Sequence, residues 1–368
     1  MKVAVTIARI FTGLLFIFSG LVKAIDPRGL AYKMQEFFEA WANAGFMKSI
    51  MLSLNDYALP FSIIMITLEV AVGVALLLGW QRKITTWILL LLIIFFTFLT
   101  SYVLFSGKIR ACGCFGDCIP LTPIQTFTKD IILLLCSLLL LVKRSYIQPV
   151  ERPAITNSIM LISIFGAAFL QWYVLLHLPV IDCLPYRKGN NLLELRKMPA
   201  NAVQDKYDYN FIYQKAGEKK EFPASSLPDS SWTFFERKQT LVQKGNNNVP
   251  LINDFSLADI DGNDVTDSVL NTGTDYYLFF IKDIPPNDGW IKKYKDFYNN
   301  AKKEAKPVFI ITAQREALEI FFSKNNLQAD KFLSADATAI KTAARVNPSL
   351  YMMHGPVVLD KRSWADLK

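Results

Sequence analysis

The sequence predicts an α-helical membrane bundle followed by a water-soluble α/β domain. The 368-residue chain is 52% hydrophobic and has a mean hydropathy of +0.25. A soluble protein contains about 45–50% apolar residues, spread along its length, but here they are concentrated before residue 178. The second half is polar and charged. This split indicates two regions that fold in different solvents.

Five apolar stretches predict the membrane helices. A hydrocarbon core of about 30 Å needs roughly 20 apolar residues in a helix. The stretches that meet or approach this length are 3–22, 59–78, 84–105, 123–142 and 155–178. The fourth has a defined start, because Thr122 and Gln125 have capping-box spacing and Pro123 stands at the first helical position. We therefore expect a four-helix core and a fifth transmembrane helix.

The basic residues predict the orientation. Arg82-Lys83 and Lys143-Arg144 lie at the opposite end of the predicted bundle from the cysteine-rich loop. The positive-inside rule then places the N-terminus in the cytoplasm and the C-terminal half in the periplasm, where disulfides are permitted. The net charge of +8 suits a bilayer with anionic headgroups. No basic stripe carries base-reading aromatics, which excludes nucleic acid as a partner.

Ionisable residues inside the predicted spans are functional candidates. Arg9, Glu69 and the pair Lys129-Asp130 interrupt apolar runs, and such groups usually face the interior of a bundle. Glu69 and Asp130 are candidate buried acids, and Arg9 is the expected partner of Glu69. A proton relay and a structural ion pair both remain open.

The cysteines form an unusual cluster. Cys112, Cys114 and Cys118 occupy seven residues, with Gly113 and Gly116 permitting a tight backbone turn. Cys183 follows the fifth helix on the same face, where it can pair with or resolve any of the three. Three interpretations remain: a thiol–disulfide exchange site, structural disulfides, and a four-thiolate zinc site. Zinc fits least, because only Cys114 and Cys118 have a usual ligand spacing, and no metal is assigned.

Residues 1–145 resemble a known family. The segment from Phe18-Ser-Gly to Asp26-Pro27 resembles the first helix of DoxX-type membrane proteins, and Cys112-Gly-Cys-Phe-Gly116 with Lys129-Asp130 resembles their MauE branch. The resemblance implies a four-helix bundle comparable with vitamin K epoxide reductase-type enzymes and redox chemistry at the membrane. It makes Cys112 and Cys114 candidate redox thiols and Glu69 a family-typical buried acid. This chain departs from the pattern by lacking Cys-x-x-Cys and by adding Cys118 and a fifth helix.

The second half predicts a β-rich segment over 184–248 and an α/β domain over 249–368. Runs such as 275–282 and 307–312 read as buried strands that alternate with helices and end in a hairpin. This order resembles a thioredoxin-like fold, with Asn347-Pro348 resembling its cis-proline loop. Where that fold carries its catalytic cysteine, residues 283–290 contain no thiol. We therefore expect a degenerate docking module, with Ile284 and Trp290 as a candidate partner surface.

The predicted division is a membrane bundle over 1–145, a fifth transmembrane helix over 146–183, a β-rich segment over 184–248 and a thioredoxin-like domain over 249–368. Two functions are compatible with it. The first is a membrane thiol–disulfide redox protein acting on periplasmic client proteins through Cys112, Cys114, Cys118 and Cys183. The alternative is a non-enzymatic subunit or scaffold of a cell-envelope complex, with structural cysteines. We expect a protein partner on the outer face in either case. No cofactor is identified; a membrane quinone is a candidate electron acceptor, although no residue pattern requires one.

Overall fold

The computed structural model describes residues 1–109, 112–215, 217–243, 245, 247–285 and 288–367. Within these ranges five helices are long and apolar enough to cross a membrane. They are α1 (Lys2–Ala24), α4 (Ala58–Leu78), α5 (Arg82–Ser106), α6 (Pro123–Val142) and α7 (Pro153–Leu176). The predicted membrane helices are confirmed, and the chain is a multi-pass membrane protein.

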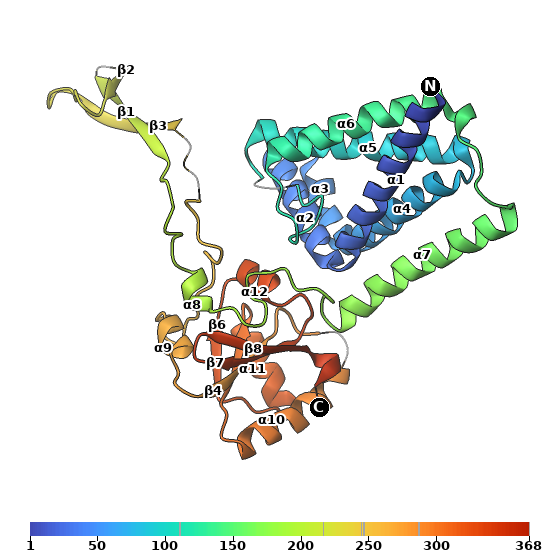
Figure 1. Ribbon diagram of the computed structural model, residues 1–368. Helices are drawn as coiled ribbons and strands as arrows, with labels where there is room; N and C mark the ends of the chain where they lie inside the picture. The colour runs from blue at the N-terminus through green and yellow to red at the C-terminus, as the bar shows by residue number, and fades with distance from the viewer. Residues whose placement is uncertain (110–111, 216, 244, 246, 286–287, 368) are drawn as a thin grey trace.

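The bundle is held by close helix packing. Helix α1 lies along α4, α5 pairs with α6, and α7 contacts α4 at one side (Figure 1). Small residues allow the first contact, because a Cβ on Gly73 would lie 2.9 Å from the carbonyl oxygen of Gly13. Small residues are the usual means by which membrane helices approach closely.

Short helices cover the end of the bundle that carries the cysteine loop (Figure 1). These are α2 (Pro27–Asn43), α3 (Lys48–Leu54) and the 3₁₀ turn η1 (Asn55–Tyr57). Phe37 of α2 packs against Val103 and Ile109. At the start of α6, the backbone N–H of Gln125 donates to the Thr122 hydroxyl while Gln125 accepts from the Thr122 N–H. This capping box is as predicted.

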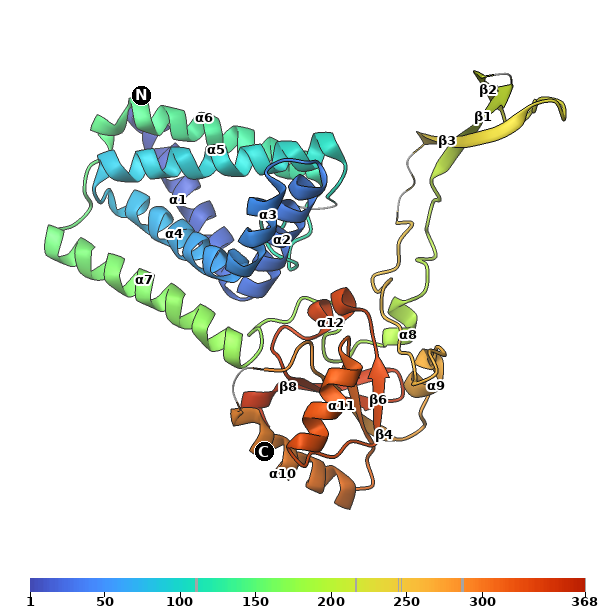
Figure 2. The same ribbon diagram turned by 180° about the vertical axis from the view of Figure 1, so that it is seen from behind.

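A small antiparallel sheet stands away from the rest of the chain. Its strands are β1 (Lys206–Lys215), β2 (Glu218–Pro223) and β3 (Thr233–Gln243), in the order β2-β1-β3. Figures 1 and 2 show it at the end of two extended segments. The short helix α8 (Leu192–Leu195) precedes it, after the turn η2 (Arg144–Tyr146) and α7.

The C-terminal domain is built on a mixed sheet of order β6-β5-β4-β7-β8 in the described part of the chain. Strands β4 (Asp275–Phe280), β5 (Val308–Thr312) and β6 (Lys331–Ser334) are parallel, β7 (Ser349–His354) pairs antiparallel with β4, and β8 (Val357–Ser363) pairs antiparallel with β7. The helices are α9 (Thr266–Leu270), α10 (Gly289–Lys303), α11 (Arg315–Lys324), α12 (Ala337–Ala343) and η3 (Trp364–Asp366). The Asn347–Pro348 peptide bond is cis. This is the predicted thioredoxin-like α/β arrangement.

Trp290 does not form the partner surface that the sequence suggested. Its side chain is fully buried, with its ring 6.2 Å from that of Phe279 and 5.9 Å from that of Phe321. Ile284 is half-buried and packs against the same cluster. The local sequence resembles an exposed turn, but Trp290 begins α10 on the face that the sheet covers, so packing determines its burial.

Candidate functional site

The cysteine loop joins α5 to α6 and folds tightly against α2. Gly113 and Gly116 have φ angles of +73° and +57°, a region that L side chains rarely adopt. The Gly116 N–H donates to the Gly113 carbonyl at 3.0 Å. A Cβ on Gly113 would lie 3.0 Å from the Cγ of Lys33 in α2. Both glycines are therefore required by the turn that brings the cysteines together.

Cys112 and Cys114 form a close thiol pair. Their sulfur atoms lie 2.9 Å apart, and no disulfide bond joins them. This separation is only about 0.9 Å longer than a disulfide. Cys114 is buried, and the Ser19 hydroxyl of α1 donates to its carbonyl at 3.0 Å. The pair is therefore fixed on the membrane bundle.

The two thiols differ in acidity. The hydrogen bond from Cys112 lowers the pKa of Cys114, and the positive charges of Lys129 and Lys23 act in the same direction against the effect of burial. The same hydrogen bond and burial raise the pKa of Cys112. Because the thiolate is the nucleophile in exchange reactions, the lowered pKa makes Cys114 the candidate nucleophile of the pair.

Buried ion pairs lie beneath the thiols. Lys23 Nζ is 2.6 Å from Glu69 Oε2, and both side chains are 3% exposed. Lys129 Nζ is 2.8 Å from Asp130 Oδ1. The other Asp130 oxygen accepts from the Thr100 hydroxyl at 3.0 Å. These acids, with Cys114 and both lysines, line a cavity of about 10 Å³, close to the volume that holds one water molecule.

The prediction that Arg9 pairs with Glu69 is wrong. Arg9 donates to the carbonyl oxygens of Leu76, Leu77 and Gln148. Leu76 and Leu77 lie in the last turn of α4, where carbonyls lose their usual intrahelical donors, so they accept from the guanidinium, and Gln148 adds a third acceptor. Lys23 is the partner of Glu69 in place of Arg9. Both Lys23 and Arg9 belong to α1, but the sequence does not reveal the packing of α1 on α4 that brings Lys23 to Glu69.

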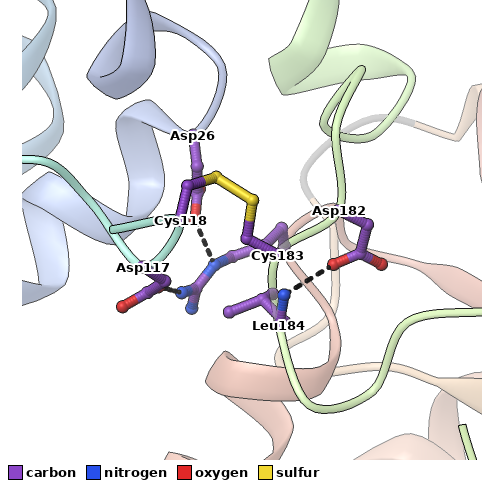
Figure 3. The surroundings of a disulfide bond; sticks show 7 residues. Asp26, Asp117, Cys118, Asp182, Cys183 and Leu184 are labelled. Carbon is purple, nitrogen blue, oxygen red and sulfur yellow. Dashed lines mark hydrogen bonds and ion pairs between the residues drawn. A yellow bond between two sulfur atoms is a disulfide. The ribbon is translucent and has the colours of Figure 1, made fainter. Parts of the chain in front are cut away.

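A disulfide joins Cys118 to Cys183, 65 residues further along the chain (Figure 3). It links the cysteine loop to the segment that follows α7. Because these two sulfurs are bonded to each other, the four outer cysteines do not form a zinc site. Cys136 remains a thiol within α6.

Two cations of the C-terminal domain contact the segments around this disulfide. Arg345 lies 2.8 Å from Asp117 and 2.7 Å from Asp26, and Lys361 lies 2.6 Å from Asp182. Sequence reasoning missed both cations, because their partners are far away in the chain and no local pattern marks them.

Comparison with known proteins finds matches to two segments of the chain. Residues 1–143 match the family described as methylamine utilisation protein MauE, and residues 207–244 match a domain of unknown function, DUF8463. Protein TlpB of Flavobacterium psychrophilum is 35% identical over 128 residues, which cover 34% of this chain and 32% of TlpB. The chain thus matches about a third of that relative's length. No solved structure matches.

The MauE match covers helices α1 to α6, the thiol pair and the buried ion pairs described above. Residues 1–143 therefore form a MauE-like membrane domain, which is fused to a C-terminal thioredoxin-like α/β domain.

Proposed function

We propose that the chain is a membrane-embedded thiol–disulfide redox protein that acts on client proteins at the outer, periplasmic face of the cytoplasmic membrane. One observation carries this proposal. A reduced pair, Cys112 and Cys114, lies in the same tight loop as Cys118, which is bonded to Cys183 as an oxidised pair. Such an arrangement lets two electrons pass between the pairs without a further reactant.

Exchange between the two pairs takes place in two displacements at sulfur. The Cys114 thiolate attacks a sulfur of the Cys118–Cys183 bond, and that bond breaks to release a thiolate. Cys112 then displaces the second sulfur from the mixed disulfide and forms the Cys112–Cys114 bond. The two leaving sulfurs take up the electron pair and the thiol protons. Client disulfides or dithiols would exchange with Cys118 and Cys183 by the same two displacements.

Buried acids support the proton transfers. Glu69 and Asp130 line the same small cavity as Cys114. We assign them the role of passing protons to and from this thiol. Their partners Lys23 and Lys129 supply the opposite charge that a buried carboxylate needs.

The periplasmic placement is supported by charge. Arg82, Lys83, Lys143 and Arg144 lie at the end of the bundle opposite the cysteine loop. In this proposal residues 1–145 carry the redox site and 146–183 lead to the outer face. Residues 184–248 form the β-rich segment, and 249–368 hold the client or another protein partner.

Trapping tests the proposal. In the Cys112→Ser/Cys114→Ser/Cys183→Ser variant, Cys118 is left without any partner thiol of the site that could resolve a mixed disulfide. We expect it to accumulate disulfide-linked envelope proteins in intact membranes, separable by non-reducing electrophoresis and lost on reduction. The same variant with Cys118→Ser added is the matched control. Equal adduct patterns in the two variants would exclude exchange at Cys118.

A scaffold function is the second candidate. The C-terminal domain contains no cysteine, and buried cations hold both segments that carry the disulfide. Differential alkylation over a titration of reduction potential separates the two functions. A Cys118–Cys183 bond that stays oxidised until the protein is denatured favours the scaffold, because structural disulfides have potentials below about −300 mV.

A further inference from the structure

Each half of the Cys118–Cys183 disulfide is preceded by an aspartate. Asp117 precedes Cys118 in the cysteine loop, and Asp182 precedes Cys183 in the segment that follows α7 (Figure 3). Each aspartate is bound by a cation of the C-terminal domain. The domain that lacks thiols thus contacts both sides of the disulfide.

Arg345 holds the cysteine loop. Its Nη2 donates to Asp117 at 2.8 Å, and its Nε donates to Asp26 at 2.7 Å. The side chain is only 8% exposed, and its guanidinium also lies over the ring of Tyr32 at 5.4 Å. Asp26 is the N-cap residue of α2. Arg345 therefore fixes the loop to the bundle and to α12 at the same time.

Lys361 holds the opposite segment. Its Nζ is 2.6 Å from Asp182 Oδ2, and its side chain is 9% exposed. The other carboxylate oxygen of Asp182 accepts from the Leu184 N–H at 3.1 Å, which closes a turn around Cys183. Lys361 comes from β8, in the same domain as Arg345. The same domain therefore contacts the segments of both cysteines.

Burying ion pairs such as these costs desolvation free energy. A buried charge is tolerated when its partner is well placed, and loss of one partner leaves the other uncompensated. Burial lowers the pKa of Lys361, while the Asp182 charge opposes that shift. The two contacts therefore favour one arrangement of the loop and the segment, whether or not the sulfur atoms are bonded.

We propose that Arg345 and Lys361 are positioning residues for the Cys118–Cys183 pair. By holding Asp117 and Asp182, they keep the two thiols close together after reduction. The disulfide then re-forms readily, because closure of a preorganised pair needs little loss of chain entropy. This inference rests on the proposed function, since it concerns a disulfide that opens and closes during exchange.

The test is the reduction potential of the pair in the full-length protein in lipid nanodiscs. The protein is equilibrated with dithiothreitol redox buffers, and the two cysteines are read by alkylation and mass spectrometry. We expect Arg345→Met and Lys361→Met each to lower the equilibrium constant for closure about tenfold, which is an upward shift of about 30 mV. Lys302→Met, which breaks an ion pair with Asp330 elsewhere in the domain, is the matched control and should cause no shift.

A double-mutant cycle isolates the contact. Asp182→Asn removes the same ion pair from the other side, so Asp182→Asn/Lys361→Met should shift the potential no further than Lys361→Met alone. If Arg345→Met does not fold, Arg345→Lys retains the charge but not the two-way contact, and should give a smaller shift in the same direction. Additive shifts in the cycle would also contradict a shared contact.

The outcomes distinguish the two proposals. A pair that titrates reversibly, with the same potential in the wild type and in the cation variants, overturns the positioning role and leaves thiol–disulfide exchange standing. A wild-type pair that cannot be reduced without denaturation overturns both.

Discussion

Cys114 illustrates how one neighbouring thiol sets reactivity. Its pKa is lowered mainly by the Cys112 hydrogen bond, so its thiolate is present below the usual range for a cysteine. We expect alkylation of Cys114 by iodoacetamide to rise with pH through a midpoint lower than that of a free thiol. Cys112→Ala removes the donor and should move this midpoint upward. Site-resolved alkylation against pH measures it, with peptide cysteine as the reference; an unchanged midpoint would contradict the role of Cys112.

The Lys23–Glu69 pair shows what a buried charge demands of its partner. Glu69→Gln leaves the Lys23 ammonium without its counter-charge, which for a buried pair costs about 3–5 kcal/mol. We expect a lower thermal transition of the purified protein. Replacing both residues in Lys23→Met/Glu69→Gln should recover part of that loss. A double variant less stable than Glu69→Gln would argue against a simple pairing.

For single residues, the sequence predicted the burial of charged side chains correctly but did not predict their ion-pair partners. Glu69 and Asp130 are both buried as expected for acids within spans. Their partners depend on helix register, which composition does not encode. A Cβ on Gly20 would lie 2.6 Å from a methyl group of Val70, and this contact brings the end of α1, with Lys23, beside Glu69.

At the scale of elements, the α1–α4 contact makes a specific demand on Gly73. A methyl group there would lie 2.8 Å from Ile17 and 2.9 Å from the carbonyl of Gly13. We expect Gly73→Ala to destabilise the bundle by roughly 1–3 kcal/mol, the usual penalty for overpacking. Gly166→Ala in α7 is the matched control, because no atom beyond its chain neighbours and its own helix backbone lies within 4 Å of the added Cβ. The measurement is the thermal unfolding transition of the two variants in the same lipid. Similar transition temperatures would contradict the prediction, because they would show that α1 and α4 can shift to accommodate the methyl group.

Elements with strong local signals were predicted, and the edge strand β6 was not. The membrane helices followed from apolar length, and the start of α6 from its capping box. Strand β6 was missed, because Lys331–Ser334 is short, begins with a lysine and lies at a sheet edge. Its extended conformation comes from parallel pairing with β5, which is a tertiary effect.

At the scale of the whole molecule, the contact between domains is the feature that sequence reasoning could not reach. Arg345 and Asp26 are 319 residues apart in the chain. Neither residue belongs to a recognisable motif for this contact. The missing thiol in the thioredoxin-like domain was visible in the sequence, but the use of that domain to hold a membrane loop was not.

The arrangement of the helices makes a prediction about topology. The five candidate spans in the described part of the chain place its two ends on opposite sides of a bilayer. Helices α6 and α7 lie between Cys118 and Cys183, so two crossings return both cysteines to one side, as their disulfide requires. With the basic residues at the far end held in the cytoplasm, protease added to spheroplasts should remove a tag after Lys368 and spare a tag at Met1. Cleavage of the Met1 tag alone would invert the orientation. It would also place Cys118 and Cys183 in a reducing compartment, where a stable disulfide is not expected.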